Sequence, residues 1–173
     1  MTDPADRILY FAYGSNMAPE RLQARVPSAQ RLGVAVLRGY RLKFHKSGRD
    51  GSAKCDASRT DDVNDEVHGV LYSMLASELP TLDGFEGRGH GYERQTVVVE
   101  RAGGELVDTE IYVATHFDAA MHPFDWYLEH VLRGADAALL PDAYVQALRS
   151  VKTMADPDEE RRARELGIYR KGG

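Results

Sequence analysis

The stretch YFAYGSN, residues 10–16, decides the fold, because an aromatic and apolar run breaks there into three small or polar residues. The first four residues have the character of a buried strand, and the last three favour turns. Apolar residues at helical spacing follow over residues 18–26, and Pro27 stops the pattern. The sequence therefore predicts a strand, a tight turn and a short helix.

The turn has two readings. Gly14 lets a ligand approach the main chain closely, and a helix that starts after the turn presents unpaired N–H groups and the positive end of its dipole. Such a turn suits an anion, for example a carboxylate. In the alternative reading, Ser15 or Asn16 caps the helix and has no further role. A phosphate-binding loop and a serine-nucleophile elbow both require spacings that this stretch lacks.

Strand and helix patterns mix along the rest of the chain. We expect strands at 31–46 and 66–74, a hairpin of 92–100 with 105–115, and helices at 77–86, 124–137 and 142–151. Single strands between helices, together with a hairpin, favour the α+β class. The expected architecture is a mixed β-sheet or small β-barrel core with flanking helices.

The chain has 173 residues, which is the usual length of one domain, so we expect a single domain over 1–173. Residues 47–65 are rich in Gly, Ser, Asp and Lys without periodicity, which predicts a long polar surface loop. From about residue 152 the chain is strongly charged, and we expect a solvated tail that forms a charged helix at most.

Composition excludes several classes of function. A hydrophobic fraction of 43% is enough for a packed core. A net charge of −5 argues against a nucleic-acid partner, because such proteins concentrate Lys and Arg. The first residues resemble no secretion signal and no run approaches about 18 apolar residues, so we expect no membrane partner and a cytoplasmic location. A single cysteine, Cys55, fits a reducing compartment.

Glu86, within LDGFEGRGHGYE at residues 82–93, is the most informative acid. It ends a predicted helix, directly before a glycine-rich segment. The negative end of the helix dipole and partial burial would both disfavour its charged form and raise its pKa. Such a carboxyl group can take and return protons near neutral pH. The alternative reading is an ordinary surface glutamate beside a flexible loop.

Other candidates for chemistry are weaker. The histidines show no close ligand spacing, so we expect no metal site. The acids at 61, 62, 65 and 66 lack the spacing and the central glycine of a calcium loop. Cys55 has no paired cysteine and no evident neighbouring base, so we interpret it as incidental rather than nucleophilic. Several tyrosines lie on elements that we expect to converge, although most tyrosines only pack.

Taken together, these stretches resemble the gamma-glutamylcyclotransferase family, including its AIG2-like members. The resemblance rests on YFAYGSN, ERLQARVPSA, EVHGVLY, LDGFEGRGHGY and YLEHVLRGA, which occur in the family's order across roughly residues 8–148. It implies a compact β-barrel-like core with flanking helices, a small-molecule γ-glutamyl substrate and no cofactor.

The resemblance also assigns site residues. It implies that Glu86 is the catalytic acid/base and that Tyr127 and, with less support, Tyr112 and Asn16 line the same pocket. The substrate cradle falls on Tyr10, Phe11, Ala12, Tyr13, Gly14 and Ser15.

The reaction that the family implies is intramolecular. The α-amino group of a γ-glutamyl compound attacks its own γ-carbonyl, which yields 5-oxoproline and a free amine or amino acid. The alternative is a binding or regulatory module that keeps the anion cradle without turnover. The polar loop and the charged tail are this chain's own features, and the sequence leaves open which amine departs and which oligomer forms.

Overall fold

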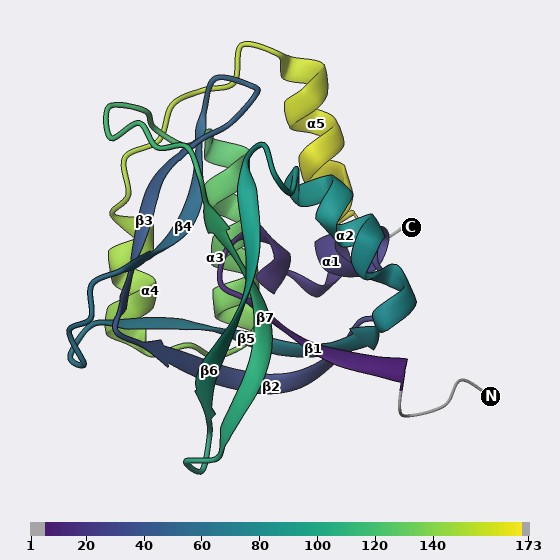
Figure 1. Cartoon of the computed structure of the whole chain (residues 1–173). Helices are drawn as coiled ribbons and strands as arrows, with labels where there is room; N and C mark the ends of the chain where they lie inside the picture. Colours follow the sequence, from purple (N-terminus) through teal and green to yellow (C-terminus); the bar gives the residue numbers. More distant parts are fainter. Residues whose placement is uncertain (1–5, 171–173) are drawn as a thin grey trace.

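The first strand closes a β-barrel. The barrel strands follow the order β1–β5–β2–β6–β7, and β1 pairs antiparallel with β5 and parallel with β7, where Tyr10 faces Glu110. The strands are β1 (Arg7–Ala12), β2 (Gln30–Arg38), β3 (Tyr40–Ser47), β4 (Ala53–Arg59), β5 (Glu66–Leu75), β6 (Tyr92–Arg101) and β7 (Leu106–Ala114). This computed structural model describes residues 6–170. Figure 1 shows the barrel with its helices, which confirms the predicted α+β class with a small β-barrel core.

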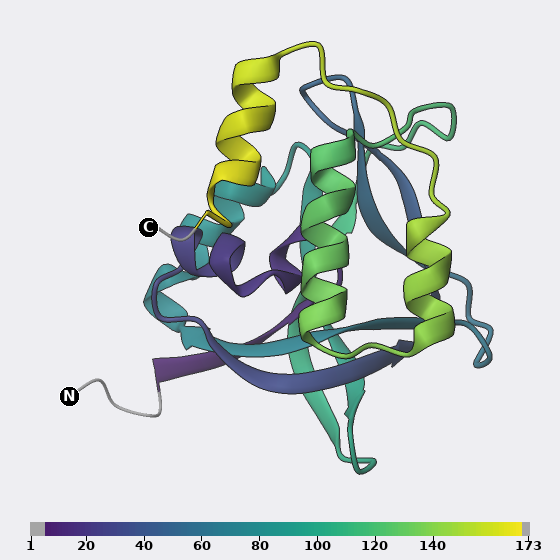
Figure 2. The same cartoon turned by 180° about the vertical axis from the view of Figure 1, so that it is seen from behind.

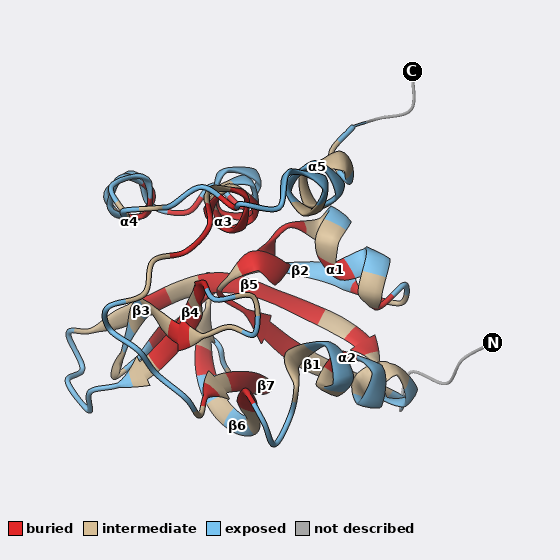
Figure 3. Cartoon of the chain, turned by 90° about the horizontal axis from the view of Figure 1, so that it is seen from above, coloured by how far each residue is buried: buried red, intermediate tan, exposed pale blue. Residues whose placement is uncertain are grey.

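The helices cover the barrel unevenly. They are α1 (Pro19–Arg25), α2 (Leu79–Glu86), α3 (Asp125–Ala137), α4 (Asp142–Arg149) and α5 (Glu159–Gly167), with 3-10 turns η2 (Ser15–Met17) and η3 (Ala76–Glu78). Seen from above, α4, α3 and α5 form one row over the strands, whereas α2 lies beside β1 (Figure 3). The view from behind shows α3 and α4 in front of the barrel (Figure 2). None of the helices within residues 6–170 has the length and apolar character needed to cross a membrane.

The predicted loop at 47–65 is wrong in its centre, where the chain forms β4. This strand pairs with β3 as a separate two-stranded sheet, with Cys55 opposite Phe44. Its polar residues are buried because they have partners: Asp56 accepts a hydrogen bond from the Ala114 N–H at 2.9 Å, and it lies 2.6 Å from His45 Nε2. A pattern of apolar residues could not reveal a strand whose polar side chains bond inward.

The charged C-terminal segment forms α5 and is tied to the rest of the protein. Glu165 forms an ion pair with Arg21 of α1 at 2.7 Å and lies 3.2 Å from the buried His130 of α3. Asp156, just before the helix, accepts a hydrogen bond from Trp126 Nε1 at 2.8 Å. Because these contacts join three helices, the segment is more than the solvated tail that its composition predicted.

Gly134 sets how closely α3 approaches the turn after β1. A Cβ placed there would lie 2.4 Å from Met17 Cβ and 2.7 Å from the Ala18 nitrogen. Real Cβ atoms essentially never approach main-chain atoms so closely. A glycine on α3 therefore lets this helix pack directly on η2, which is itself part of the predicted cradle.

Replacing Gly134 with alanine is expected to lower the free energy of unfolding by about 1 to 3 kcal/mol, because the added methyl overlaps the η2 main chain. Gly84→Ala is the matched control, since it is also a helical glycine but nothing lies within 4 Å of a Cβ there. That control should stabilise the protein by up to about 1 kcal/mol. The free energy of unfolding of both variants is measured by urea denaturation, with circular dichroism as the signal. Equal changes in this free energy would contradict the close contact at Gly134.

Candidate active site

The turn after β1 carries backbone donors that the fold leaves unused. The Met17 N–H bonds to the Gly14 carbonyl at 3.1 Å, which forms η2. Within the described part of the chain, the N–H groups of Gly14, Ser15 and Asn16 donate to no acceptor. All three residues line one cavity. Consecutive unpaired N–H groups are able to hold a carboxylate or an oxyanion.

The alternative reading of this turn, helix capping, is wrong. Helix α1 begins at Pro19, later than predicted, and no side chain caps it. Ser15 Oγ instead accepts a hydrogen bond from Arg21 Nε at 3.1 Å. Asn16 turns toward the cavity. Ser15 therefore contacts α1 through the Arg21 side chain, and neither polar side chain of the turn caps the helix.

Other elements approach Gly14 closely. Its φ of −116° is open to most residues. A Cβ at this position, however, would lie 3.0 Å from Cys55 Cβ on β4 and 3.3 Å from Tyr127 Oη on α3. The absence of a side chain therefore allows β4 and α3 to pack closely over the turn. This close packing is a physical reason for a glycine at the end of an apolar strand.

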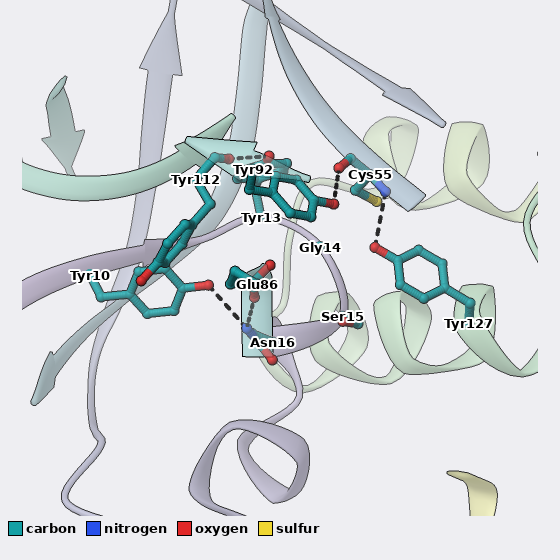
Figure 4. A pocket seen from close by; sticks show the side chains of 10 residues that line it. All are labelled: Tyr10, Tyr13, Gly14, Ser15, Asn16, Cys55, Glu86, Tyr92, Tyr112 and Tyr127. Carbon is teal, nitrogen blue, oxygen red and sulfur yellow. Dashed lines mark hydrogen bonds between the residues drawn. The ribbon is translucent and has the colours of Figure 1, made fainter. Parts of the chain in front are cut away.

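Glu86 reaches this cavity from the end of α2. Gly87 ends the helix in the left-handed conformation at a φ of 63°, as its sequence position predicted. Asn16 Nδ2 donates to Glu86 Oε1 at 2.9 Å and to Tyr10 Oη at 3.1 Å. Figure 4 shows the glutamate in the middle of the cavity, with Tyr10 and Tyr127 on either side. The structure thus brings the predicted acid and the predicted turn together.

The environment favours the protonated form of Glu86. Its side chain is 14% exposed, and burial raises its pKa above the ordinary value, as expected from the sequence. Nearby cations oppose this rise: Arg25 Nη1 lies 3.9 Å from Oε1, and the charges of Arg21 and Lys46 act in the same direction. The Asn16 hydrogen bond also favours the charged form. Burial and the surrounding cations therefore act on the Glu86 pKa in opposite directions, and the net shift is upward.

Tyrosines form most of the remaining wall. Tyr112 Oη donates to the Asp83 carboxylate. Figure 4 shows that Tyr92 Oη donates to the Cys55 carbonyl at 2.6 Å and that Tyr127 Oη accepts from the Cys55 N–H at 2.9 Å. Burial raises the pKa of each wall tyrosine, namely Tyr10, Tyr13, Tyr92, Tyr112 and Tyr127. These phenols therefore stay neutral, and they offer polar contacts without adding charge.

Two predicted cradle residues, Phe11 and Ala12, do not line the cavity. Successive side chains of a strand point to opposite faces, so Phe11 points away from the face that Tyr10 presents. It packs in the core at Gly69, where a Cβ would lie 2.7 Å from the Phe11 ring. Ala12 is buried in the same core. The other predicted residues, Tyr10, Tyr13, Gly14, Ser15, Asn16, Glu86, Tyr112 and Tyr127, all line the cavity.

Sequence reasoning missed Cys55 and Tyr92 as lining residues. Cys55 was placed in a loop, and only the pairing of β4 with β3 brings it over the turn. Burial raises the pKa of its thiol to about 12, so it is not a thiolate at neutral pH. Tyr92 lies at the start of β6, directly after the glycine-rich segment that follows Glu86. This nearness to Glu86 in the sequence is the signal that could have identified Tyr92 as a lining residue.

Glu86 also borders two wider cavities. The innermost cavity is narrow, about 30 Å³, and the next one, about 130 Å³, contains Arg21, Arg25 and Lys46 together with Glu86. The third has a volume of about 290 Å³ and extends over the residues between β3 and β4. A ligand with a small acidic head and a longer second half would fit this succession.

Comparisons with known proteins agree in pointing to one family. The model of the AIG2-like family matches residues 66–148. Gamma-glutamylcyclotransferase of Homo sapiens is 33% identical over 151 residues, which cover 85% of this chain and 80% of the relative. The putative gamma-glutamylcyclotransferase YkqA of Bacillus subtilis is 34% identical over 141 residues, which cover 78% of this chain and 49% of the relative. A solved gamma-glutamyl cyclotransferase structure has a TM-score of 0.79 at 28% identity, and the match covers 91% of this chain and 99% of that one.

Asn16→Ala is expected to raise the pKa of Glu86 further, because the amide hydrogen bond favours the charged carboxylate. The pH titration of the Glu86 Cδ signal in ¹³C-labelled protein measures this pKa directly. Asn64→Ala, on an exposed turn, is the matched control and should leave the titration in place. An unchanged or lower Glu86 pKa in the Asn16 variant would show that the amide does not support the carboxylate.

Glu86→Gln is expected to increase stability at neutral pH. Because the folded-state pKa is raised, the folded state binds this proton more tightly than the unfolded chain. The stability that the proton supplies is fully present below about pH 4.3, the ordinary glutamate value, and is lost as pH rises through the folded-state pKa. The variant's Tm should therefore exceed that of the wild type near pH 7 and converge with it near pH 4. The exposed Glu20→Gln should show no such divergence, and a destabilised Glu86 variant at pH 7 would contradict the assignment.

Proposed function

The chain belongs to the gamma-glutamylcyclotransferase family, and we propose that it releases 5-oxoproline and a free amine or amino acid from a γ-glutamyl substrate. One observation carries this proposal. A mostly buried carboxyl group, Glu86, is held by Asn16 at 2.9 Å beside the unused N–H groups of Gly14 and Ser15. A proton-exchanging acid next to an anion cradle is what an internal acyl transfer requires.

The reaction needs little chemistry from the protein, because the substrate carries its own nucleophile. Glu86 takes a proton from the α-ammonium group, and the freed α-amino nitrogen attacks the γ-carbonyl carbon. The bond from that carbon to the leaving nitrogen then breaks as Glu86 returns its proton to that nitrogen. The ring nitrogen loses its second proton, so the products are the neutral lactam and the departing amine in its ammonium form. One carboxyl group thus serves as base and then as acid, and general acid–base catalysis of this kind typically contributes about 10² to 10⁴ in rate.

Orientation supplies a larger share of the rate. Holding an internal nucleophile against its carbonyl gives effective molarities of about 10⁵ to 10⁸ M, or roughly 7 to 11 kcal/mol. The narrow tyrosine-walled cavity supports this role, since its hydroxyl groups are fixed by hydrogen bonds to the protein. The N–H groups at Gly14 and Ser15 would hold the α-carboxylate or the developing oxyanion, each oxyanion donor being worth about 3 kcal/mol.

Glu86→Gln is expected to lower 5-oxoproline formation by about 10² to 10⁴, because the amide cannot accept the α-ammonium proton. Purified protein should be incubated with γ-glutamyl-alanine, γ-glutamyl-lysine and a γ-glutamyl isopeptide, and the ring product measured by mass spectrometry. Glu20→Gln, an exposed glutamate on α1, should retain wild-type activity.

Two outcomes would count against the proposal. Full activity of a folded Glu86→Gln variant would remove the assigned acid/base. Calorimetric binding of γ-glutamyl compounds by the wild type, with no 5-oxoproline from any of them, would instead favour a binding module.

A further inference from the structure

Lys46 is a buried cation to which the described residues offer no hydrogen bond and no ion pair. Lys46 is 8% exposed. Among residues 6–170, its ammonium group makes no hydrogen bond and forms no ion pair with a carboxylate. The Nζ atom lies 4.8 Å from the centre of the Tyr92 ring, over its face. A cation–π contact offsets only part of the cost of burying a charge. The charges of Glu86 and Asp50 act on this ammonium group, but no carboxylate of residues 6–170 forms an ion pair with it, so it can accept an anion from a ligand.

The fold directs this ammonium group into the cavities beyond Glu86. The register of β3 against β4 shifts between Phe44 and Lys46, which places Lys46 opposite Lys54. Lys46 lines both the 130 Å³ and the 290 Å³ cavities, but it does not line the inner cavity that contains the cradle. Gly91 leaves room for it, since a Cβ there would lie 3.0 Å from Nζ.

The neighbouring cations already have partners. Lys54 Nζ forms an ion pair with Asp50 at 2.8 Å. Arg21 forms an ion pair with Glu165 at 2.7 Å, and Arg25 lies 3.9 Å from Glu86. Among the cations that line the 130 Å³ cavity, Lys46 is therefore the one that lacks a carboxylate partner within the described residues.

We infer that Lys46 binds a carboxylate on the leaving half of the substrate, and that the protein selects γ-glutamyl amino acids and peptides over γ-glutamyl amines that carry no anion. This inference rests on the proposed function. If the glutamyl half lies against the Gly14–Ser15 turn, the leaving nitrogen must face Glu86 to receive its proton. The rest of the leaving group then extends into the wider cavities, where two cations lack a carboxylate partner within residues 6–170. They are the buried Lys46, which lines both cavities, and the exposed Arg49, which lines only the larger one.

Two other roles for Lys46 lead to different results. If it held the α-carboxylate of the glutamyl half, or only adjusted the pKa of Glu86, its loss would affect every γ-glutamyl substrate to the same extent. A role in reading the leaving group affects only substrates with an anionic leaving group. Selectivity between two substrates therefore separates the three roles.

The test compares γ-glutamyl-alanine with γ-glutamyl-alaninamide, which differ only in the carboxylate of the leaving group. The wild type should show a kcat/KM at least about 10-fold higher for the acid. In Lys46→Gln this value should fall by about 10- to 100-fold for γ-glutamyl-alanine and by less than about 3-fold for the amide, the range expected for one hydrogen bond to a charged group. The ratio of kcat/KM for the acid to kcat/KM for the amide is measured for the wild type and for Lys46→Gln. Because both proteins use the same two leaving amines, comparing these ratios cancels any intrinsic difference between the amines.

Two variants complete the design. Lys46→Arg keeps the charge and should restore part of the preference for the acid. Lys43→Gln, an exposed lysine on the same strand, should change neither substrate. Because turnover of the amide reports on the rest of the site, it also shows that Lys46→Gln is folded.

The outcomes are distinct. A preserved preference for the acid in Lys46→Gln, or an equal loss on both substrates, overturns the inference and leaves the proposed function standing. Equal kcat/KM values for the two substrates in the wild type also overturn the inference and leave the proposed function standing. Failure of the wild type to form 5-oxoproline from either of these substrates, and also from γ-glutamyl-lysine and the γ-glutamyl isopeptide, overturns the proposed function, and the inference with it.

Discussion

The hydrogen bond between Asn16 and Glu86 is the interaction on which the site depends. It joins the turn after the first strand to the end of α2, two segments 70 residues apart in the chain. A carboxyl group among buried tyrosines costs free energy unless it has partners, and the Asn16 amide supplies one without adding a charge. The turn can offer this amide because Asn16 is free of any capping role. The same few residues therefore provide the unpaired N–H groups and hold the Glu86 carboxyl group.

The surrounding elements make this arrangement rigid. Gly134 lets α3 pack directly on η2, and Gly14 lets β4 and α3 close over the turn. The backbone of Cys55 then bonds to Tyr92 on one side and to Tyr127 on the other. Because these hydroxyl groups are fixed by main-chain atoms, the cavity wall is held in place before a ligand arrives, which is the condition for precise orientation.

Most of the fold and part of the site could be predicted from the sequence, and the failures have a physical cause. Strand alternation, the glycine stop at Gly87 and the hairpin turn are local signals, so those elements were predicted correctly. Strand β4 was missed because Asp56 satisfies its polar atoms through residues distant in the chain. Phe11 was assigned to the cradle as part of a contiguous stretch, whereas the strand's alternation turns it into the core. The partners of β4 are distant in the chain and could not be predicted from the strand alone, whereas the place of Phe11 in the core follows from local alternation.

Glu86 and Lys46 line the same two cavities, and yet no ion pair joins them in the described chain. If they were paired, each would satisfy the other and neither would be available to a ligand. Kept apart, each remains only partly compensated, and burial acts on the two pKa values in opposite directions, raising that of Glu86 and lowering that of Lys46. This cost to stability is typical of functional sites. A zwitterionic substrate that brings an ammonium group to one residue and a carboxylate to the other relieves both penalties at once. The arrangement therefore favours molecules with two charges at a fixed separation over molecules with only one.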